Sequence, residues 1–478
     1  MAYARSVLSA TLAFSLVACG GGGSSSSAPP VSVSPTPTPT PPPATGGDSC
    51  SLANRQQFVR DVLNEWYLFP DLLATNVNAA NYNDIQDYID ALVAPARAQS
   101  KDRFFTYITS IKEENDLIQN GSSAGFGIRL GYDTSGNRVY VLEAFEAGTG
   151  FQAGMDRGTQ LLTIGGQSVE SLMSSGGPQA VINALGPSDP GLSRSFTFRT
   201  REGTERDANI SKTEFSLDPI SDRYGVRVLN DDWAGPVGYI NLRTFIVQDA
   251  GPQLRTAFQQ FKDQGITKVI LDLRYNGGGL VSVAELLGDL LAADKAGQVF
   301  SKTVLRPSKS SENDVDRFEA QSQAISATKI AVIGRGGTAS ASELVTNSFI
   351  PYLGDNLALV GTNTFGKPVG QFAFDRSACD DRLRAVAFKT TNANDQGEYF
   401  TGLASVVRRT CAANDGIFEP LGSPAETSIS AALDFLGGRT CTPISSGQDQ
   451  TVQSAGNRQQ LLQPRIPTPA QREVPGLF

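Results

Sequence analysis

The residues of this chain best suited to covalent chemistry are Ser340, Lys367 and Gln371. Ser340 follows a glycine-rich turn after the apolar run 329–333, and a helix-like segment comes next. The sequence therefore predicts strand, tight turn and helix, with the serine at the turn. A hydroxyl there lies among unpaired backbone N–H groups, which stabilise a developing oxyanion. The simpler interpretation is that Ser340 only caps the helix.

The chain of 478 residues contains no histidine, so a serine hydrolase built from it needs another base. The usual substitutes for imidazole are a lysine or an N-terminal amine. A free lysine has a pKa near ~10.4, which burial must lower before the amine can accept a proton at neutral pH. Phe365, Pro368 and Val369 surround Lys367 in the sequence and favour such a pocket. The alternative is an ordinary surface lysine in a turn.

Two short motifs in this stretch carry a resemblance to a known family. Thr-Ala-Ser-Ala-Ser-Glu at 338–343 and Thr-Phe-Gly-Lys-x-x-x-Gln at 364–371 resemble the active-site signature of the C-terminal processing peptidases, or tail-specific proteases. The chain departs from that pattern at Pro368, at Thr362 and Asn363, and in a slightly long serine-to-lysine interval. The resemblance implies peptide hydrolysis by a Ser–Lys dyad, with these roles: Ser340 as nucleophile, Lys367 as general base, Gln371 orienting the amine, and Glu343 supporting the helix or loop.

A second glycine-rich segment, 274–279, follows the buried-looking strand 268–273. Such a strand end could cradle a phosphate, but no Gly-Lys-Ser/Thr or GxGxxG pattern is present, so the sequence indicates no nucleotide and no other cofactor. By resemblance to the family, a backbone N–H of Gly277 or Gly278, together with that of Ala341, forms the oxyanion hole. The sequence does not choose between the two glycines.

Short strands separated by turns dominate residues 121–215, which look like a PDZ domain. The segment Gly125, Phe126, Gly127 and Ile128 resembles a carboxylate-binding loop. Its amides would hold the C-terminus of a peptide that adds a strand to the sheet. Taken alone, a Gly-x-Gly strand start is more often a bulge or a turn.

The predicted fold is a multidomain α/β protein. Its parts are a helical N-terminal segment, a β-rich PDZ-like domain and a spiral α/β core of the type shared by Clp peptidase and crotonase, the core type being implied by the resemblance. The expected boundaries are a signal peptide at 1–18, a linker at 19–49, a helical domain at 50–120, a PDZ-like domain at 121–215, a peptidase core at 216–441 and a disordered tail at 442–478.

The first residues read as a secretory signal whose apolar run, 7–17, is too short to span a bilayer. The sequence 16–19 resembles a bacterial lipobox, which implies lipidation of Cys19 and anchoring to the cell envelope, with the periplasmic face of the outer membrane as the expected location. An ordinary cleaved signal is the alternative. Residues rich in Gly, Ser and Pro follow and would hold the folded body off the membrane.

Four cysteines remain after Cys19 is set aside, and an even number in an exported chain suggests disulfides with three possible connectivities. We expect Cys379–Cys411, within one hairpin-rich segment, and Cys50–Cys441, joining the two ends of the folded body. A zinc site is not expected, because there is neither histidine nor a CxxC pair.

A net charge of −8 without any basic run argues against nucleic acid as a partner. The expected partners are polypeptides with accessible C-terminal tails and, through the lipid, a membrane. Two other functions stay open: a catalytically idle periplasmic PDZ module that binds protein C-termini, and a hydrolase of esters or cell-wall components. The apolar ending 474–478 is either inert or competes with substrate tails for the loop at 125–128.

Overall fold

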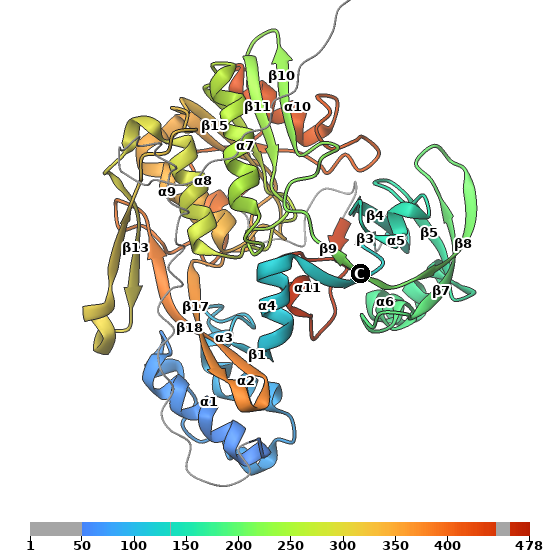
Figure 1. Ribbon diagram of the computed structural model, residues 1–478, viewed down its shortest axis with the longest axis vertical. Coiled ribbons are helices and arrows are strands. Elements are labelled where there is room, and N and C mark those ends of the chain that lie inside the picture. Colours follow the sequence, from blue (N-terminus) through green and yellow to red (C-terminus); the bar gives the residue numbers. More distant parts are fainter. Residues whose placement is uncertain (1–49, 134, 446–458) are drawn as a thin grey trace, which may run out of the picture. The chain divides into compact units, whose positions relative to one another are not determined.

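The centre of the fold is a six-stranded sheet with the order β10–β11–β12–β15–β16–β19. The computed structural model describes residues 50–133, 135–445 and 459–478, which lie in one compact unit. Strands β11 to β19 of this sheet are parallel, and β10 pairs antiparallel with β11 at one edge (Figure 1). The six strands are Val226–Asp231, Gly235–Asn241, Lys268–Asp272, Lys329–Gly334, Leu357–Gly361 and Arg409–Ala412.

Alternate residues of the central strands are buried on opposite faces of this sheet. In β12, Val269 and Leu271 join the hydrophobic cluster that contains side chains of α7, α8 and α9, whereas Ile270 joins the cluster that contains α10. A sheet covered by helices on both faces needs apolar side chains at every position, which explains the uninterrupted apolar runs. The predicted α/β core is confirmed. The four helices are Ala250–Asp263, Val281–Leu291, Ala341–Leu353 and Thr427–Leu436.

A second, seven-stranded sheet has the order β20–β3–β4–β5–β7–β8, with β6 beside β5. It confirms the β-rich character predicted for this part of the chain. Two further strands, β2 (Ser122–Gly125) and β9 (Thr213–Ser216), pair with each other beside it. Its strands β3 to β8 and β20 are Ile128–Asp133, Arg138–Ala144, Gln160–Ile164, Gln167–Ser168, Ser193–Arg199, Glu205–Ser211 and Gln459–Leu461. The helices α5 and α6 of this part are Thr149–Gln152 and Val169–Leu185.

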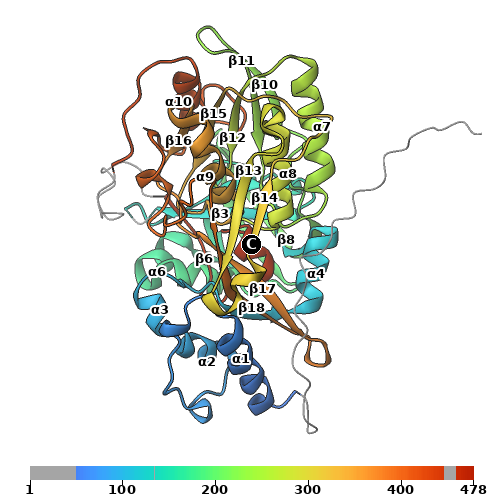
Figure 2. The same ribbon diagram turned by 90° about the vertical axis from the view of Figure 1, so that its left-hand side faces the viewer.

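The helical N-terminal segment shares its hydrophobic cluster with the long hairpin of β17 (Val369–Arg376) and β18 (Asp381–Thr391). Figure 2 shows α1 beside this hairpin. Strand β1 also pairs with β18, in a sheet that β13 and β14 extend. The segment thus completes the burial of the hairpin that begins just after Lys367. The bounds of α1 to α4, β1, β13 and β14 are Leu52–Trp66, Ile85–Leu92, Ala94–Ala98, Ile111–Asn120, Tyr107–Ser110, Val299–Leu305 and Asp314–Arg317.

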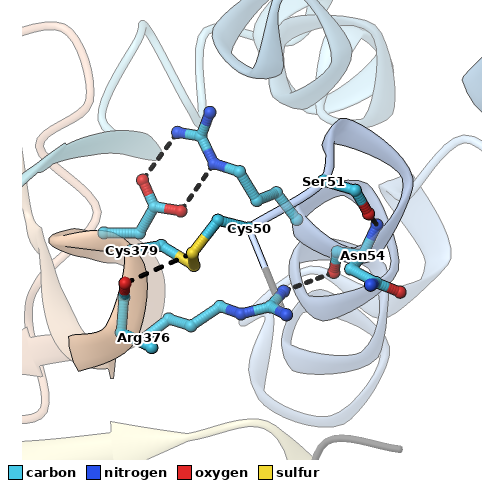
Figure 3. Close-up of a disulfide and its surroundings, with 8 residues drawn as sticks. Cys50, Ser51, Asn54, Arg376 and Cys379 are labelled. Carbon is cyan, nitrogen blue, oxygen red and sulfur yellow. Dashed lines mark hydrogen bonds and ion pairs between the residues drawn. A yellow bond between two sulfur atoms is a disulfide. The ribbon is translucent and has the colours of Figure 1, made fainter. Parts of the chain in front are cut away.

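The predicted cysteine pairing is wrong. The structure joins Cys50 to Cys379 and Cys411 to Cys441, in place of Cys379–Cys411 and Cys50–Cys441. The turn between β17 and β18 brings Cys379 against the start of α1, with a Cα–Cα distance of 5.4 Å (Figure 3). Beside it, Arg376 donates a 2.6 Å hydrogen bond to the carbonyl of Asn54.

The second disulfide forms because the chain returns to β19 after α10. The backbone N–H of Ala412 donates to the carbonyl of Thr442 at 2.6 Å, which places Cys441 next to Cys411. Pairing was inferred from position along the chain, whereas a disulfide requires Cα atoms roughly 4.4–6.8 Å apart. Only the packing of distant elements decides that distance.

The expectation of a disordered tail at 442–478 is wrong for the part that the structure describes. Residues 459–461 form strand β20 against β3, and Pro469–Glu473 form the short helix α11. Leu462, Val474, Leu477 and Phe478 are buried. These four residues are too irregularly spaced to give a helical or strand pattern in the sequence, because they join two clusters that are formed mainly by other segments.

The predicted signal peptide, the linker and Cys19 lie outside the described residues. Among the helices within 50–133, 135–445 and 459–478, none combines the length and the apolar character that a membrane crossing demands.

A buried cluster of charges supports the glycine-rich loop after β12. The guanidinium of Arg274 pairs with Asp272 at 2.9 Å, with Glu426 at 2.8 Å and with Asp415 at 3.1 Å. Arg157, from the β-rich segment, pairs with Asp415 at 2.6 Å. Removing one partner from such a group leaves a buried charge uncompensated, which is more costly than losing a surface pair.

We expect Glu426→Gln to lower the free energy of unfolding by about 3–5 kcal/mol at pH 7. Burial alone would raise the pKa of Glu426, but the charge of Arg274 outweighs it and lowers that pKa from 4.5 to about 2. The stabilisation is therefore complete above pH 4.5 and is lost as the pH falls toward 2. Denaturant unfolding from pH 7 to pH 2 measures this loss. Glu202→Gln, at an exposed ion pair, is the control; equal stability of the two variants would contradict the prediction.

Candidate active site

Ser340 lies at the turn between β15 and α9 in a strained backbone conformation. Its φ is 54° and its ψ is −115°, unusual for a residue with a side chain. Such strain costs about 1–3 kcal/mol and persists only where the surroundings enforce it. Gly278 helps to enforce it: a Cβ added there would lie 2.7 Å from the Cβ of Ser340. The turn therefore fixes the serine against the loop that follows β12.

Glu343 connects Ser340 to the segment that carries Lys367. It is fully buried in the first turn of α9. Its Oε2 accepts the backbone N–H of Ser340 at 3.1 Å and that of Lys367 at 2.7 Å. Its Oε1 accepts the hydroxyl of Thr364 at 2.6 Å and the N–H of Gly366 at 2.7 Å. One carboxylate thus holds the serine turn and the lysine turn together.

Desolvation by burial raises the pKa of the Glu343 carboxyl, although these four hydrogen bonds oppose the rise.

The amine of Lys367 is partly buried and bonded to a neighbouring side chain. Its Nζ donates a 2.7 Å hydrogen bond to Oε1 of Gln371, and Nε2 of Gln371 donates at 2.5 Å to the carbonyl of Phe105. The amine also lies 5.2 Å from the centroid of the Phe105 ring. Burial lowers the pKa of Lys367, because removal from water disfavours the ammonium form.

The side chains of Ser340 and Lys367 are not hydrogen-bonded to each other. No hydrogen bond within 50–133, 135–445 and 459–478 joins the Ser340 hydroxyl to the Lys367 amine. Their connection runs through Glu343 and the two backbones.

The two candidate glycines of the oxyanion hole differ in what their N–H groups do. The N–H of Gly278 donates to the side-chain oxygen of Asn276 at 2.9 Å, so this donor is engaged within its own loop. The N–H of Gly277 donates to the carbonyl of Glu473 at 3.0 Å. Gly277 therefore offers its donor to a peptide carbonyl. A hydrogen-bond partner for the N–H of Ala341 is absent from the described part of the chain.

The segment 125–128 also holds a peptide chain. The backbone N–H groups of Phe126 and Ile128 donate to the main-chain oxygen of Phe478 at 3.0 and 3.2 Å. A Cβ on Gly125 would lie 2.7 Å from the main-chain carbonyl carbon of Phe478, so the approach needs a glycine there. Gly127 has a φ of 69°, which turns neighbouring amides toward one oxygen.

Three contributors to the site were missed from the sequence. The carbonyl of Phe105 orients Gln371, and a carbonyl gives no residue-specific signal. Arg103 donates to the carbonyls of Phe365 and Gly366 at 2.7 and 2.6 Å and so shapes the turn before Lys367. Asn276 was recognisable only as part of a glycine-rich loop.

Two parts of the chain match one protein family in the expected order. Residues 54–107 match the peptidase S41 N-terminal domain, and residues 236–400 match peptidase family S41. The second match contains both the serine turn and the lysine turn. Both matched parts are therefore similar to peptidase family S41. The matches support the predicted class of enzyme, a serine-type peptidase.

Similar proteins agree with this assignment. A "Carboxyl-terminal-processing protease" of Synechocystis sp. is 26% identical over 328 residues, covering 67% of this chain and 70% of that protein. A "C-terminal processing peptidase, chloroplastic" of Tetradesmus obliquus is 29% identical over 278 residues, covering 54% of each. A "Carboxyl-terminal-processing peptidase 3, chloroplastic" of Arabidopsis thaliana is 24% identical, covering 55% of this chain and 49% of that protein. The chain thus spans about half the length of two of these relatives.

Among solved structures, a putative S41 protease of Bacteroides fragilis superposes with a TM-score of 0.60 at 22% sequence identity. The superposition covers 83% of this chain and 99% of that one, which shows a shared fold.

Proposed function

We propose that this protein is a serine endopeptidase that cleaves exported polypeptides near their C-termini through a Ser340–Lys367 dyad. The observation that carries the proposal is the Glu343 bridge, which bonds the backbones of both residues through one oxygen. The lowered pKa of Lys367 adds to it, because a general base must be neutral at the working pH. Hydrogen bonds between catalytic groups often tighten only when substrate binds, so a gap between the two side chains is compatible with catalysis.

The reaction runs through an acyl-enzyme. The hydroxyl of Ser340 attacks the scissile carbonyl while its proton passes to the neutral amine of Lys367. The N–H groups of Gly277 and Ala341 stabilise the oxyanion. Lys367 then gives its proton to the leaving amine, which leaves an ester on Ser340. A water molecule, deprotonated by Lys367, hydrolyses that ester and restores the serine. Gln371 holds the amine in position throughout, through its 2.7 Å hydrogen bond.

The C-terminal end of the substrate binds to the loop at 125–128 in this proposal. Two N–H groups, of Phe126 and Ile128, converge on one main-chain oxygen in the structure, which is the arrangement a terminal carboxylate requires. The β-rich segment then acts as a PDZ-like domain that recruits substrate tails.

A peptide-cleavage assay with mass spectrometry of the products tests the proposal. A peptide with a free apolar C-terminus should be cut by the wild type, and its C-terminal amide should be cut more slowly. A fluorophosphonate probe that labels wild type but not Ser340→Ala would exclude the idle binding module. Hydrolysis of esters with no cleavage of any peptide would overturn the assignment to polypeptides.

The location of the enzyme rests on Cys19, which we propose carries a lipid that anchors the protein to the bacterial cell envelope. We expect Cys19→Ala to move the protein from the membrane fraction to the soluble fraction, or to stop its processing. Fractionation of expressing cells with immunoblotting measures this. A soluble wild-type protein with an unmodified mature N-terminus would contradict it.

A further inference from the structure

The described C-terminal segment, Gln459–Phe478, contacts both proposed substrate-binding regions at once. It enters as β20, whose residues 459–461 pair with 131–133 of β3. It then leaves the sheet, forms α11 and returns to β3 from Gly476 onward. In Figure 1, α11 lies beside α4. The segment therefore adds backbone to one strand in two places.

At its far end the segment makes the contacts expected of a bound peptide. The carbonyl of Gly476 accepts from Leu130 at 2.8 Å, and the N–H of Phe478 donates to the carbonyl of Ile128 at 2.9 Å. The Phe478 side chain is 3% exposed and belongs to the hydrophobic cluster that contains Phe126 and Ile128. Strand addition combined with a side chain buried in a pocket is how PDZ-type grooves hold peptides.

Five residues earlier, the same segment covers the proposed oxyanion hole. The Glu473 carbonyl accepts from the N–H of Gly277. A Cβ on Gly277 would lie 2.6 Å from the Arg472 carbonyl and 3.1 Å from the Glu473 carbonyl carbon. A substrate carbonyl cannot reach this donor while Glu473 holds it.

The bound segment has the geometry of an inhibitor and not of a substrate. Residues Pro469–Glu473 are helical and begin with a capping box. The N–H of Gln471 donates to the hydroxyl of Thr468 at 3.2 Å, and the N–H of Thr468 donates to the side-chain oxygen of Gln471 at 3.1 Å. The N–H of Val474 donates back to Ala470 at 2.8 Å. The peptide bond after Glu473 is thus part of a closed turn, whereas cleavage requires reacting atoms aligned for attack.

Internal hydrogen bonds keep this turn closed. Gln463 accepts from the N–H of Gly476 at 3.0 Å and donates to the Gln471 carbonyl at 2.8 Å. Gln471 in turn donates to the Leu477 carbonyl at 2.7 Å. The loop between the two contacts with β3 is therefore pre-organised, which lowers the entropic cost of holding it in the cleft.

The docked segment also brings two charged side chains toward Lys367. Burial lowers the pKa of Lys367; Glu473 of the segment and Asp102 raise it, whereas Arg472 of the segment and Arg384 lower it. Because Glu473 and Arg472 act in opposite directions, the block rests on the backbone contacts at Gly277 and at 125–128.

We propose that residues 459–478 are an internal peptide ligand that blocks both the 125–128 loop and the Ser340 cleft, and that polypeptides with a bulky apolar last residue activate the enzyme by displacing it. The proposal rests on the proposed function. The contacts of Phe478 indicate the class of polypeptide that would displace the segment. Two backbone N–H groups bind one main-chain oxygen, and the aromatic ring is buried.

Phe478→Asp tests this, because a carboxylate cannot occupy a site that is 3% exposed without a large desolvation cost. A tethered ligand has an effective concentration in the millimolar range, so releasing it should raise kcat/KM for a peptide ending in Leu-Phe by roughly 10- to 100-fold. Ile466→Asp is the matched control from the same segment, because Ile466 is 63% exposed, and it should behave as wild type. A synthetic peptide of sequence 466–478 should inhibit Phe478→Asp again.

Unchanged kcat/KM in a Phe478→Asp protein that unfolds at the wild-type temperature would overturn the proposal. If that variant does not fold, the milder Phe478→Ala takes its place with the same expected direction.

A binding measurement separates this proposal from the proposed function, since it needs no catalysis. In a Ser340→Ala background, a fluorescent peptide ending in Leu-Phe should bind Phe478→Asp more tightly than the parent, by fluorescence anisotropy. Excess peptide should also increase hydrogen–deuterium exchange at 474–478 in the parent. Peptide binding without increased exchange at 474–478 would overturn the proposal that this segment competes with substrate. Increased exchange without hydrolysis by any variant would overturn only the proposed peptidase activity.

Discussion

Replacing Ser340 by alanine is expected to lower kcat for peptide cleavage by at least about 10⁴-fold, because the acyl-enzyme cannot form without the hydroxyl. The substitution should leave folding intact. The unusual backbone of Ser340 is held by Glu343 and Gly278, and the contact with Gly278 is through the Cβ, which alanine keeps. Circular dichroism and thermal unfolding check the fold, and mass spectrometry of cleaved peptide measures the rate.

Ser342→Ala is the matched control, two residues along the same helix. Ser342 is fully buried and donates its hydroxyl to the carbonyl of Asn276 at 3.1 Å, so it faces the protein interior. Losing that hydrogen bond costs about 1 kcal/mol of stability and should leave kcat near wild type. An inactive Ser342→Ala beside an active Ser340→Ala would show that the nucleophile is misassigned.

The sequence was sufficient to predict the central sheet and the turn that carries Ser340. Buried parallel strands are apolar at every position, so β12 and β15 stand out as short apolar runs between glycine-rich turns. The glycines around Ser340 indicate a turn whose backbone conformation residues with side chains rarely adopt. Both patterns involve only neighbouring residues, so they predict these elements without knowledge of the fold.

The disulfides and the C-terminal segment were not predictable for the opposite reason. Cys379 meets Cys50 only because the β17–β18 hairpin packs against α1. Leu477 and Phe478 look like an unstructured ending because their partners lie on β3 and in clusters formed by distant segments. Our proposal of Gly277 over Gly278 likewise rests on the partners of their N–H groups, Glu473 and Asn276, which the sequence does not indicate.

Replacing Lys367 by methionine is expected to lower kcat by roughly 10²- to 10⁴-fold, the usual contribution of a general base. Methionine fills similar space in the pocket beside Phe105 and has no basic group, so the loss reports proton transfer and not packing. Lys389→Met is the matched control: Lys389 lies opposite Val369 on β18 and pairs with Glu398 at the surface. It should keep wild-type activity.

The pH profile distinguishes a base from a structural lysine. Because burial lowers the pKa of Lys367, the neutral amine should be populated at a pH below the ordinary value of 10.5, and kcat/KM should rise with pH through that lowered pKa to a plateau. Gln371→Leu removes the hydrogen bond that fixes the amine and should reduce kcat more than it changes KM. A wild-type profile without a rising limb, or full activity of Lys367→Met, would exclude Lys367 as the base.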